Sequence, residues 1–84
     1  MEYHFTGTGD SPDFTFIADG VIDGTGKVIS YSVVKSIKVK RKGNESVLMI
    51  TAEENDTKVE YYYSVAPKDE ESLKKAVADI ETNY

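Results

Sequence analysis

The chain of 84 residues contains no cysteine and no tryptophan, and it has only two prolines and one histidine. The lack of cysteine excludes disulfides, thiolate nucleophiles and cysteine-ligated zinc. Small secreted domains are usually stabilised by disulfides, so we expect a reducing compartment, the cytoplasm. The single histidine, His4, has no second metal ligand or catalytic partner at a useful spacing, and we interpret it as a half-exposed strand residue.

Long apolar runs are also absent. The longest uninterrupted one covers only residues 47–50, far short of the about 20 residues that a membrane-spanning helix needs. The first residues show no basic stretch followed by an apolar run, so we do not expect a signal peptide there. The length fits one domain, and 39% hydrophobic with 30% charged residues is typical of a globular domain rather than a disordered chain.

Catalytic and ligand-binding motifs are not apparent. The segments Gly7-Thr8-Gly9 and Gly24-Thr25-Gly26 neither continue as G-x-G-x-x-G nor open a helix, so we interpret both as turns. The aspartates between residues 10 and 23 lack calcium-loop spacing. No two groups stand at a catalytic spacing, and we therefore expect no enzymatic activity, no metal and no cofactor.

Hydrophobic alternation predicts a mostly β chain. We expect extended segments over residues 3–5, 14–17, 28–40, 47–51 and 58–65, with 21–22 continuing the second beyond a turn or bulge at Asp19-Gly20. Turns are expected at residues 23–26, 42–45 and 53–56. A period of two places Ile37, Val39, Val59, Tyr61, Tyr63 and Val65 on the buried face, and Lys38, Lys40, Lys42, Lys58, Glu60, Tyr62 and Ser64 on the other.

The C-terminal segment changes to a helical period. Its apolar stripe consists of Leu73, Ala76, Val77, Ile80 and Tyr84. We expect Asp69 to cap the helix, Glu71 to pair with Lys75, and the stripe to dock on the sheet. The predicted fold is therefore α+β, a single domain over residues 1–84. It is a bent antiparallel sheet or partly open barrel of about six strands, closed by one C-terminal helix.

Three stretches resemble the pleckstrin-homology-like superfold, particularly its small bacterial and GRAM-type members. Residues 14–21 are similar to an early strand of such domains, with Asp-Gly before a further apolar residue. Residues 29–37 are similar to their I-P-Y-x-x-I-x-x-I element, with Ser30 where proline is common. Residues 73–80 resemble the helix that plugs the open end of the barrel. The resemblance implies a bent sheet with a capping helix, in a superfold that binds lipids, peptides and proteins.

Charge is distributed unevenly along a chain of net charge −5. Residues 28–44 carry five bases and no acid, whereas the segments on both sides are acidic. The bases are Lys35, Lys38, Lys40, Arg41 and Lys42, and they are the candidate binding residues together with Tyr62. For the five bases, the alternatives to a binding role are a solvated strand face and internal pairing with Glu45, Glu53 or Glu60. For Tyr62, the alternative is burial by a second layer of the fold, and we favour it.

The function that we expect is non-catalytic binding of a protein or peptide partner, or self-association into a homo-oligomer. The alternative is electrostatic binding of an anionic surface, lipid headgroups or nucleic acid, through residues 35–42. We do not expect nucleic acid, because no aromatic residue alternates with the lysines and the rest of the chain is acidic. We do not expect phosphoinositide membranes either. Lipid-binding members of the resembled superfold crowd basic residues into the first loop, and residues 7–13 carry two acids and no base.

Overall fold

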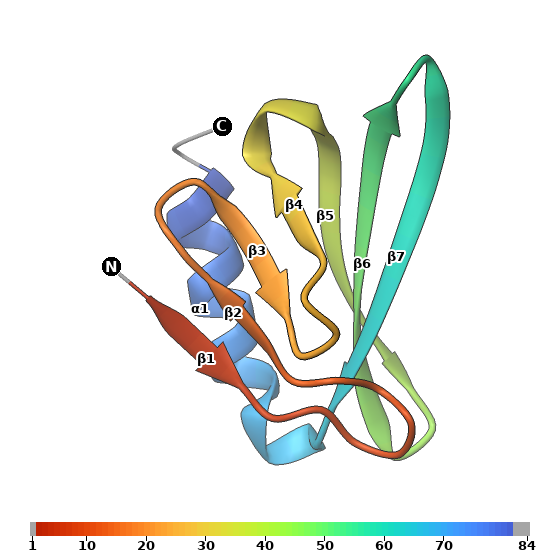
Figure 1. Ribbon diagram of the computed structural model, residues 1–84. Helices are drawn as coiled ribbons and strands as arrows, with labels where there is room; N and C mark the ends of the chain where they lie inside the picture. The colour runs from red at the N-terminus through yellow and green to blue at the C-terminus, as the bar shows by residue number, and fades with distance from the viewer. Residues whose placement is uncertain (1, 82–84) are drawn as a thin grey trace.

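The computed structural model describes residues 2–81, which form two antiparallel sheets and one helix (Figure 1). The strands are β1 (Tyr3–Phe5), β2 (Phe14–Phe16), β3 (Gly20–Asp23), β4 (Val28–Ser30), β5 (Val34–Lys42), β6 (Glu45–Glu54) and β7 (Thr57–Val65). Short 3-10 turns, η1 (Tyr31–Val33) and η2 (Pro67–Asp69), precede β5 and the helix α1 (Glu70–Glu81). The predicted class, mostly sheet with a C-terminal helix, is confirmed, and the sheets do not close into a barrel.

The two sheets follow chain order, β1-β2-β3-β4 and β5-β6-β7, so every neighbouring pair within a sheet is a hairpin. We expected about six strands, and seven are present. Residues 14–16 and 20–23 pair as a hairpin instead of forming one interrupted strand, and η1 divides the expected extended stretch 28–40 into β4 and β5. Gly20 permits this arrangement. A Cβ atom there would lie 2.2 Å from the carbonyl oxygen of Ile29 on β4.

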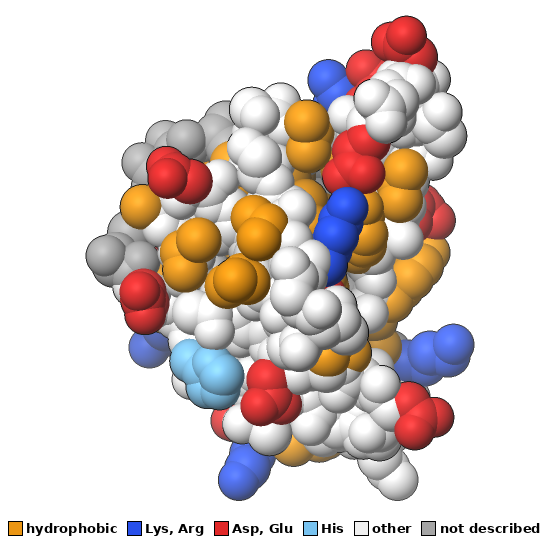
Figure 2. All heavy atoms as spheres, viewed as in Figure 1, with side chains coloured by type: hydrophobic (Ala, Val, Ile, Leu, Met, Phe, Trp, Pro, Cys, Tyr) orange, Lys and Arg blue, Asp and Glu red, His pale blue; other side chains and the backbone are white. Residues whose placement is uncertain are grey.

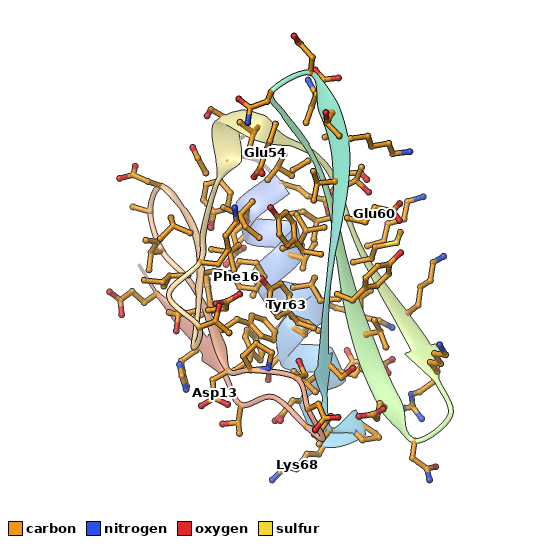
Figure 3. All side chains as sticks on the ribbon, turned by 45° about the vertical axis from the view of Figure 1, so that its right-hand side comes forward. Asp13, Phe16, Glu54, Glu60, Tyr63 and Lys68 are labelled. Atoms are coloured by element: carbon orange, nitrogen blue, oxygen red, sulfur yellow. The ribbon has the colours of Figure 1, made fainter. Side chains whose placement is uncertain are left out.

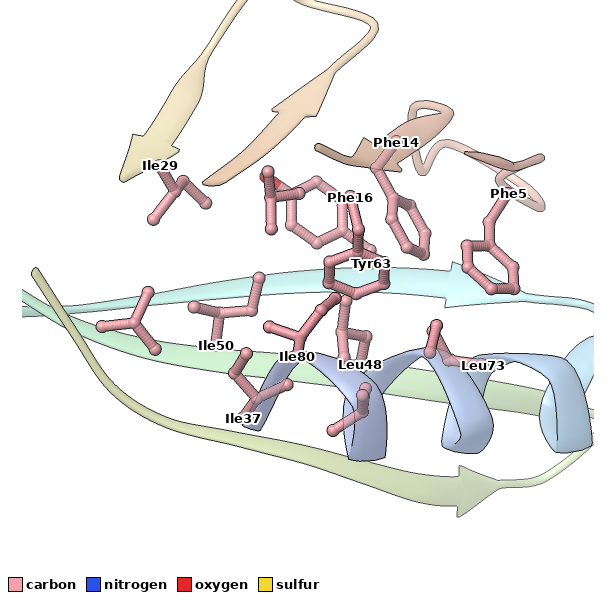
Figure 4. Close-up of a cluster of buried hydrophobic side chains, with 14 of the residues drawn as sticks. Phe5, Phe14, Phe16, Ile29, Ile37, Leu48, Ile50, Tyr63, Leu73 and Ile80 are labelled. Atoms are coloured by element: carbon pink, nitrogen blue, oxygen red, sulfur yellow. The ribbon is translucent and has the colours of Figure 1, made fainter. Parts of the chain in front are cut away.

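The core lies between the two sheets and α1. Phe14 of β2 packs against Tyr63 of β7, with ring centroids 5.0 Å apart, and Phe5 and Phe16 complete the aromatic cluster. Figure 4 shows this cluster above β7, with side chains of α1 in front of those of β6. The buried members of the helical stripe are Leu73, Ala76, Val77 and Ile80. The predicted docking of the helix is confirmed for these four, and Tyr84 lies outside the described residues.

The entry to α1 differs from the prediction. Asp69 makes no side-chain hydrogen bond among the described residues, and its amide donates to the Ala66 carbonyl (2.9 Å) within the 3-10 turn that Pro67 begins. The expected cap is therefore wrong. The expected pair of Glu71 with Lys75 is wrong as well, since the i,i+4 ion pair joins Glu70 and Lys74 (3.1 Å).

The predicted phase of the long strands is confirmed. Ile37 and Tyr63 are buried, Val39, Val59 and Tyr61 are half-buried on the same side, and the lysines and Glu60 are exposed on the other. Within residues 2–81, no helix has the length and apolar character to cross a membrane.

Candidate functional site

The sheet β5-β6-β7 has one face packed on the core, and no element within residues 2–81 covers its other face. We call the second one the outer face. The strand register aligns its side chains in rows that run across the three strands. One row joins Lys38, Met49 and Tyr62, and the next joins Lys40, Val47 and Ser64. In Figure 3, β7 lies in front, with Tyr63 on its core side and Glu60 on its outer side. The outer face therefore presents lysines along β5 beside apolar side chains on β6 and β7.

Three lysines form the basic edge of this face, and we call Lys38, Lys40 and Lys42 the lysine row. All three are exposed, and none forms an ion pair within residues 2–81. Same-face residues on a strand are about 7 Å apart, so three charges line a distance of about 14 Å. The alternative that we considered, ion pairing of the bases with Glu45, Glu53 or Glu60, therefore does not apply to these three lysines.

The acids considered as partners are engaged elsewhere. Glu45 accepts a hydrogen bond from the Thr8 hydroxyl (2.6 Å), and Glu60 accepts one from Tyr62 (2.8 Å). Glu53 lies 4.0 Å from Lys35. No ion pair therefore neutralises the lysine row within residues 2–81, although Glu45 lies directly opposite Lys42 in the strand register and Glu60 lies on the same face.

Arg41 and Lys35 are separated from the lysine row. Arg41 follows the core-side phase of β5, and its guanidinium contacts Glu70 of α1 (2.9 Å). Lys35 lies at the register shift between Val34 and Ser36, beside Glu53. Of the six candidate residues, the structure brings Lys38, Lys40, Lys42 and Tyr62 together on the outer face, and Arg41 borders the same surface only at the β5–β6 hairpin.

Tyr62 corrects our expectation of burial on both sides of β7. Its side chain is 58% exposed, because α1 and the first sheet both pack on the opposite face of the second sheet. Its hydroxyl donates to Glu60, which raises the pKa of Tyr62. Exposed tyrosine is a residue type that protein interfaces favour, so Tyr62 marks this face as a candidate contact surface.

A groove of about 990 Å³ runs along this face beside the β5–β6 hairpin. Its lining residues are Lys40, Arg41, Lys42, Gly43, Asn44, Glu45, Val47, Met49, Tyr62 and Ser64. A second depression of about 400 Å³, between Lys38 and Glu60, continues it across the middle of the sheet. Met49 borders both, so the two depressions adjoin at this side chain, which is the apolar residue among the polar and charged ones that line the second.

Val47 and Met49 are the site residues that the sequence analysis missed. Residues 47–50 are apolar at every position, which means that β6 presents apolar side chains to both faces. We read this run only as a strong strand. Because Val47 and Met49 share a face with the lysines, this run could have predicted an apolar strip between β5 and β7.

Glu70 connects α1 to the sheet beneath the groove. Its carboxylate accepts hydrogen bonds from the Ser46 hydroxyl and from Arg41, and it pairs with Lys74. These contacts, the one from Ser46 first, lower the pKa of Glu70 to about 2. The end of the β5–β6 hairpin is thereby fixed to the start of the helix, which holds the groove in one shape.

The first sheet carries a smaller exposed apolar patch. Ile22 and Val28 are opposite each other on β3 and β4, at 38% and 53% exposure. Figure 2 shows hydrophobic side chains grouped on this surface near the only histidine. His4 lies in the same cross-strand row, with Nδ1 2.9 Å from the Thr15 hydroxyl. No row of like charges flanks this patch, so its chemistry is less selective than that of the outer face.

Within residues 2–81, no three of the His, Asp and Glu side chains gather as a metal site would require. The chain matches no protein-family model, no curated protein and no solved structure. The interpretation of the outer face therefore depends on its geometry and chemistry.

Proposed function

We propose that the protein is a non-catalytic binding module whose outer face holds an acidic peptide or an acidic segment of a protein partner. The observation that carries the proposal is the row of three unpaired lysines beside the apolar strip of Val47, Met49 and Tyr62. The lysines supply charge complementarity and the strip supplies apolar contact. A segment with acidic residues and one large apolar anchor matches both.

An extended partner fits the dimensions of the site. The lysine row spans about 14 Å, which is the length over which an extended segment places three side chains on one face. Tyr62 lies across β6 from Lys38, so an apolar anchor on Met49 contacts Tyr62 while acidic neighbours reach the lysines. An exposed tyrosine supplies a large contact surface at low cost in conformational entropy, and a flexible methionine side chain adapts to the shape of a partner.

Binding of an anionic surface, lipid headgroups or nucleic acid, is the second candidate. The exposure of Lys38, Lys40 and Lys42 favours it, because three charges on one face can contact successive phosphates. The apolar strip and the acidic remainder of the chain disfavour it. Such binding weakens steeply with salt, whereas a peptide held partly by apolar contact weakens less.

The proposed context is a PH-like domain that acts in the cytoplasm. Two antiparallel sheets with a C-terminal helix support the first part, and the cysteine-free composition supports the second. Neither assignment is needed for the binding test below.

The test is fluorescence polarisation with two labelled peptide libraries. One alternates Asp or Glu with single Leu, Phe or Tyr residues, and the other replaces every acid with Lys. We expect binding from the acidic library, and about tenfold or greater weakening by Lys40→Glu and by Tyr62→Ala. Lys68→Glu is the matched charge control, because Lys68 is exposed on η2 away from the groove.

Two results would overturn the proposal. One is equal binding of the acidic and basic libraries, and the other is acidic binding that Lys40→Glu and Tyr62→Ala leave unchanged. Labelled oligonucleotides and anionic vesicles are titrated in parallel. Micromolar binding to either one at physiological salt, lost when the lysine row is changed to glutamate, would place the second candidate first.

A further inference from the structure

The second sheet has two edge strands, β5 and β7, and at the edge of β7 alternate residues direct their backbone groups away from β6. The β6–β7 hairpin has a two-residue turn, so Glu54 and Thr57 are a hydrogen-bonded pair and alternate residues from Thr57 to Val65 bond to β6. The N–H and C=O groups of Lys58, Glu60, Tyr62 and Ser64 therefore point away from β6.

Only one end of this edge is covered. The Thr8 amide donates to the Ser64 carbonyl (2.9 Å), and the Ser64 amide donates to the Ser11 hydroxyl (2.9 Å). Within residues 2–81, no bond reaches the outward backbone groups of Lys58, Glu60 or Tyr62. In Figure 1 this part of β7 forms the margin of the molecule, and the β6–β7 hairpin projects beyond the other elements. An open strand edge of this kind is a template for another strand.

Two copies of β7 can pair antiparallel in only a few registers, because outward residues must meet outward residues. A two-fold axis at Glu60 places Glu60 opposite the same residue of the second copy, and like charges directly opposite are unfavourable. An axis at Tyr61 brings Lys58 opposite Ser64, whose backbone groups the residues 8–11 already occupy. An axis at Val59 brings Lys58 opposite Glu60 twice.

We propose that the protein self-associates by antiparallel pairing of β7 with β7 of a second copy, about a two-fold axis at Val59. The Val59 register forms four backbone hydrogen bonds, two for each Lys58–Glu60 pair. It also forms two cross-strand ion pairs on the outer face and a contact of Val59 with its symmetry mate. The product is one continuous six-stranded sheet with two outer faces side by side. The inference is independent of what the outer face binds.

The paired segment contains only a few residues from each copy, so the interface is small and we expect weak association. We expect a dissociation constant on the order of 0.1–1 mM for the isolated pairing. Dimerisation places two lysine rows on one surface, and a partner with two acidic segments would then bind with increased avidity.

The test is sedimentation velocity from about 10 µM to about 1 mM protein, the range over which an interface this small associates. Lys58→Glu creates two Glu–Glu pairs across the axis, and Glu60→Lys creates two Lys–Lys pairs. Each variant alone should dimerise about tenfold more weakly than the wild type. An equimolar mixture should form a heterodimer at wild-type strength, because each pair is then again of opposite charge. Lys68→Glu is the control for net charge, and it should dimerise like the wild type.

Restoration by mixing is the decisive result, since loss of folding in one variant could not produce it. The proposal is overturned if the wild type stays monomeric throughout the range. It is equally overturned if Lys58→Glu dimerises as strongly as the wild type, or if mixing the two variants restores nothing. None of these three results bears on peptide binding, which the libraries and the Lys40→Glu variant measure separately.

Discussion

Replacing Ile80 with alanine tests how much the docked helix contributes to stability. Ile80 lies in the last turn of α1 and is only 3% exposed. The substitution removes three buried carbon atoms, which at about 0.8 kcal/mol each cost about 2.4 kcal/mol in transfer free energy. A residual cavity adds to this, and partial collapse at the helix end subtracts from it. We expect a total loss of about 2–4 kcal/mol.

A loss of this size is large for a small domain. Stabilities of about 0.05–0.15 kcal/mol per residue give a free energy of unfolding of about 4–13 kcal/mol for this chain. The thermal midpoint should therefore fall by about 8–32 °C, as measured by circular dichroism. The denaturant dependence of the unfolding free energy should stay the same, because the surface exposed on unfolding barely changes. At the lower end of the stability range, the variant is partly unfolded at room temperature.

Glu81→Ala is the matched control, since Glu81 is the exposed neighbour in the same helical turn. It should change the unfolding free energy by less than about 0.5 kcal/mol. If the thermal midpoint of Ile80→Ala lies within about 3 °C of that of the wild type, the substitution costs less than about 1 kcal/mol. In that case α1 does not close the core as described.

Three further predictions concern the interior. Gly20→Ala should lower the thermal midpoint or perturb the β3–β4 pairing, measured by hydrogen exchange, because its Cβ would meet the Ile29 carbonyl; unchanged exchange would contradict this. Glu70 has a pKa of about 2 against an ordinary 4.5, so its contribution is present above pH 4.5 and is lost as the pH falls towards 2. Glu70→Gln should be less stable at neutral pH and should show a smaller acid-induced loss; an identical acid profile would contradict the contacts of this carboxylate. Burial raises the pKa of Tyr31 to about 12 and also raises that of Tyr63, so stability should decline as the pH rises above 10, in parallel with phenolate absorbance. Unperturbed titration of every tyrosine in the folded protein would refute that burial.

Much of the fold could be predicted because strand phase is a local property. Alternation from Ile37 onward fixed which side of β5 faces the core, and the tight turns at Gly43 and Asn55 set the register of the hairpins. The helical period of the last segment likewise identified its buried stripe. Strand phase, turn position and helical period depend on residues close together in the sequence, so a single sequence is enough to predict them.

The exposure of Tyr62 could not be predicted in the same way. Whether a second layer covers a sheet face depends on how the whole chain packs, and Tyr61, Tyr62 and Tyr63 provide apolar surface on both sides of β7. The role of Asp69 failed for a local reason, since Pro67 starts the helical turn before the expected cap. The position of Arg41 followed the strand alternation, but its partner Glu70 comes from an element distant in sequence.

The most direct test of the outer face as the binding surface is an amide chemical-shift map of the ¹⁵N-labelled protein during titration with the tightest acidic peptide. We predict that the largest changes occur at the lysine row, at Val47 and Met49, and at Tyr62. The amides of Ile22 and Val28 on the first sheet should stay unperturbed. Largest changes at Ile22 and Val28, with the lysine row silent, would show that the partner binds the first sheet and would contradict the proposed site.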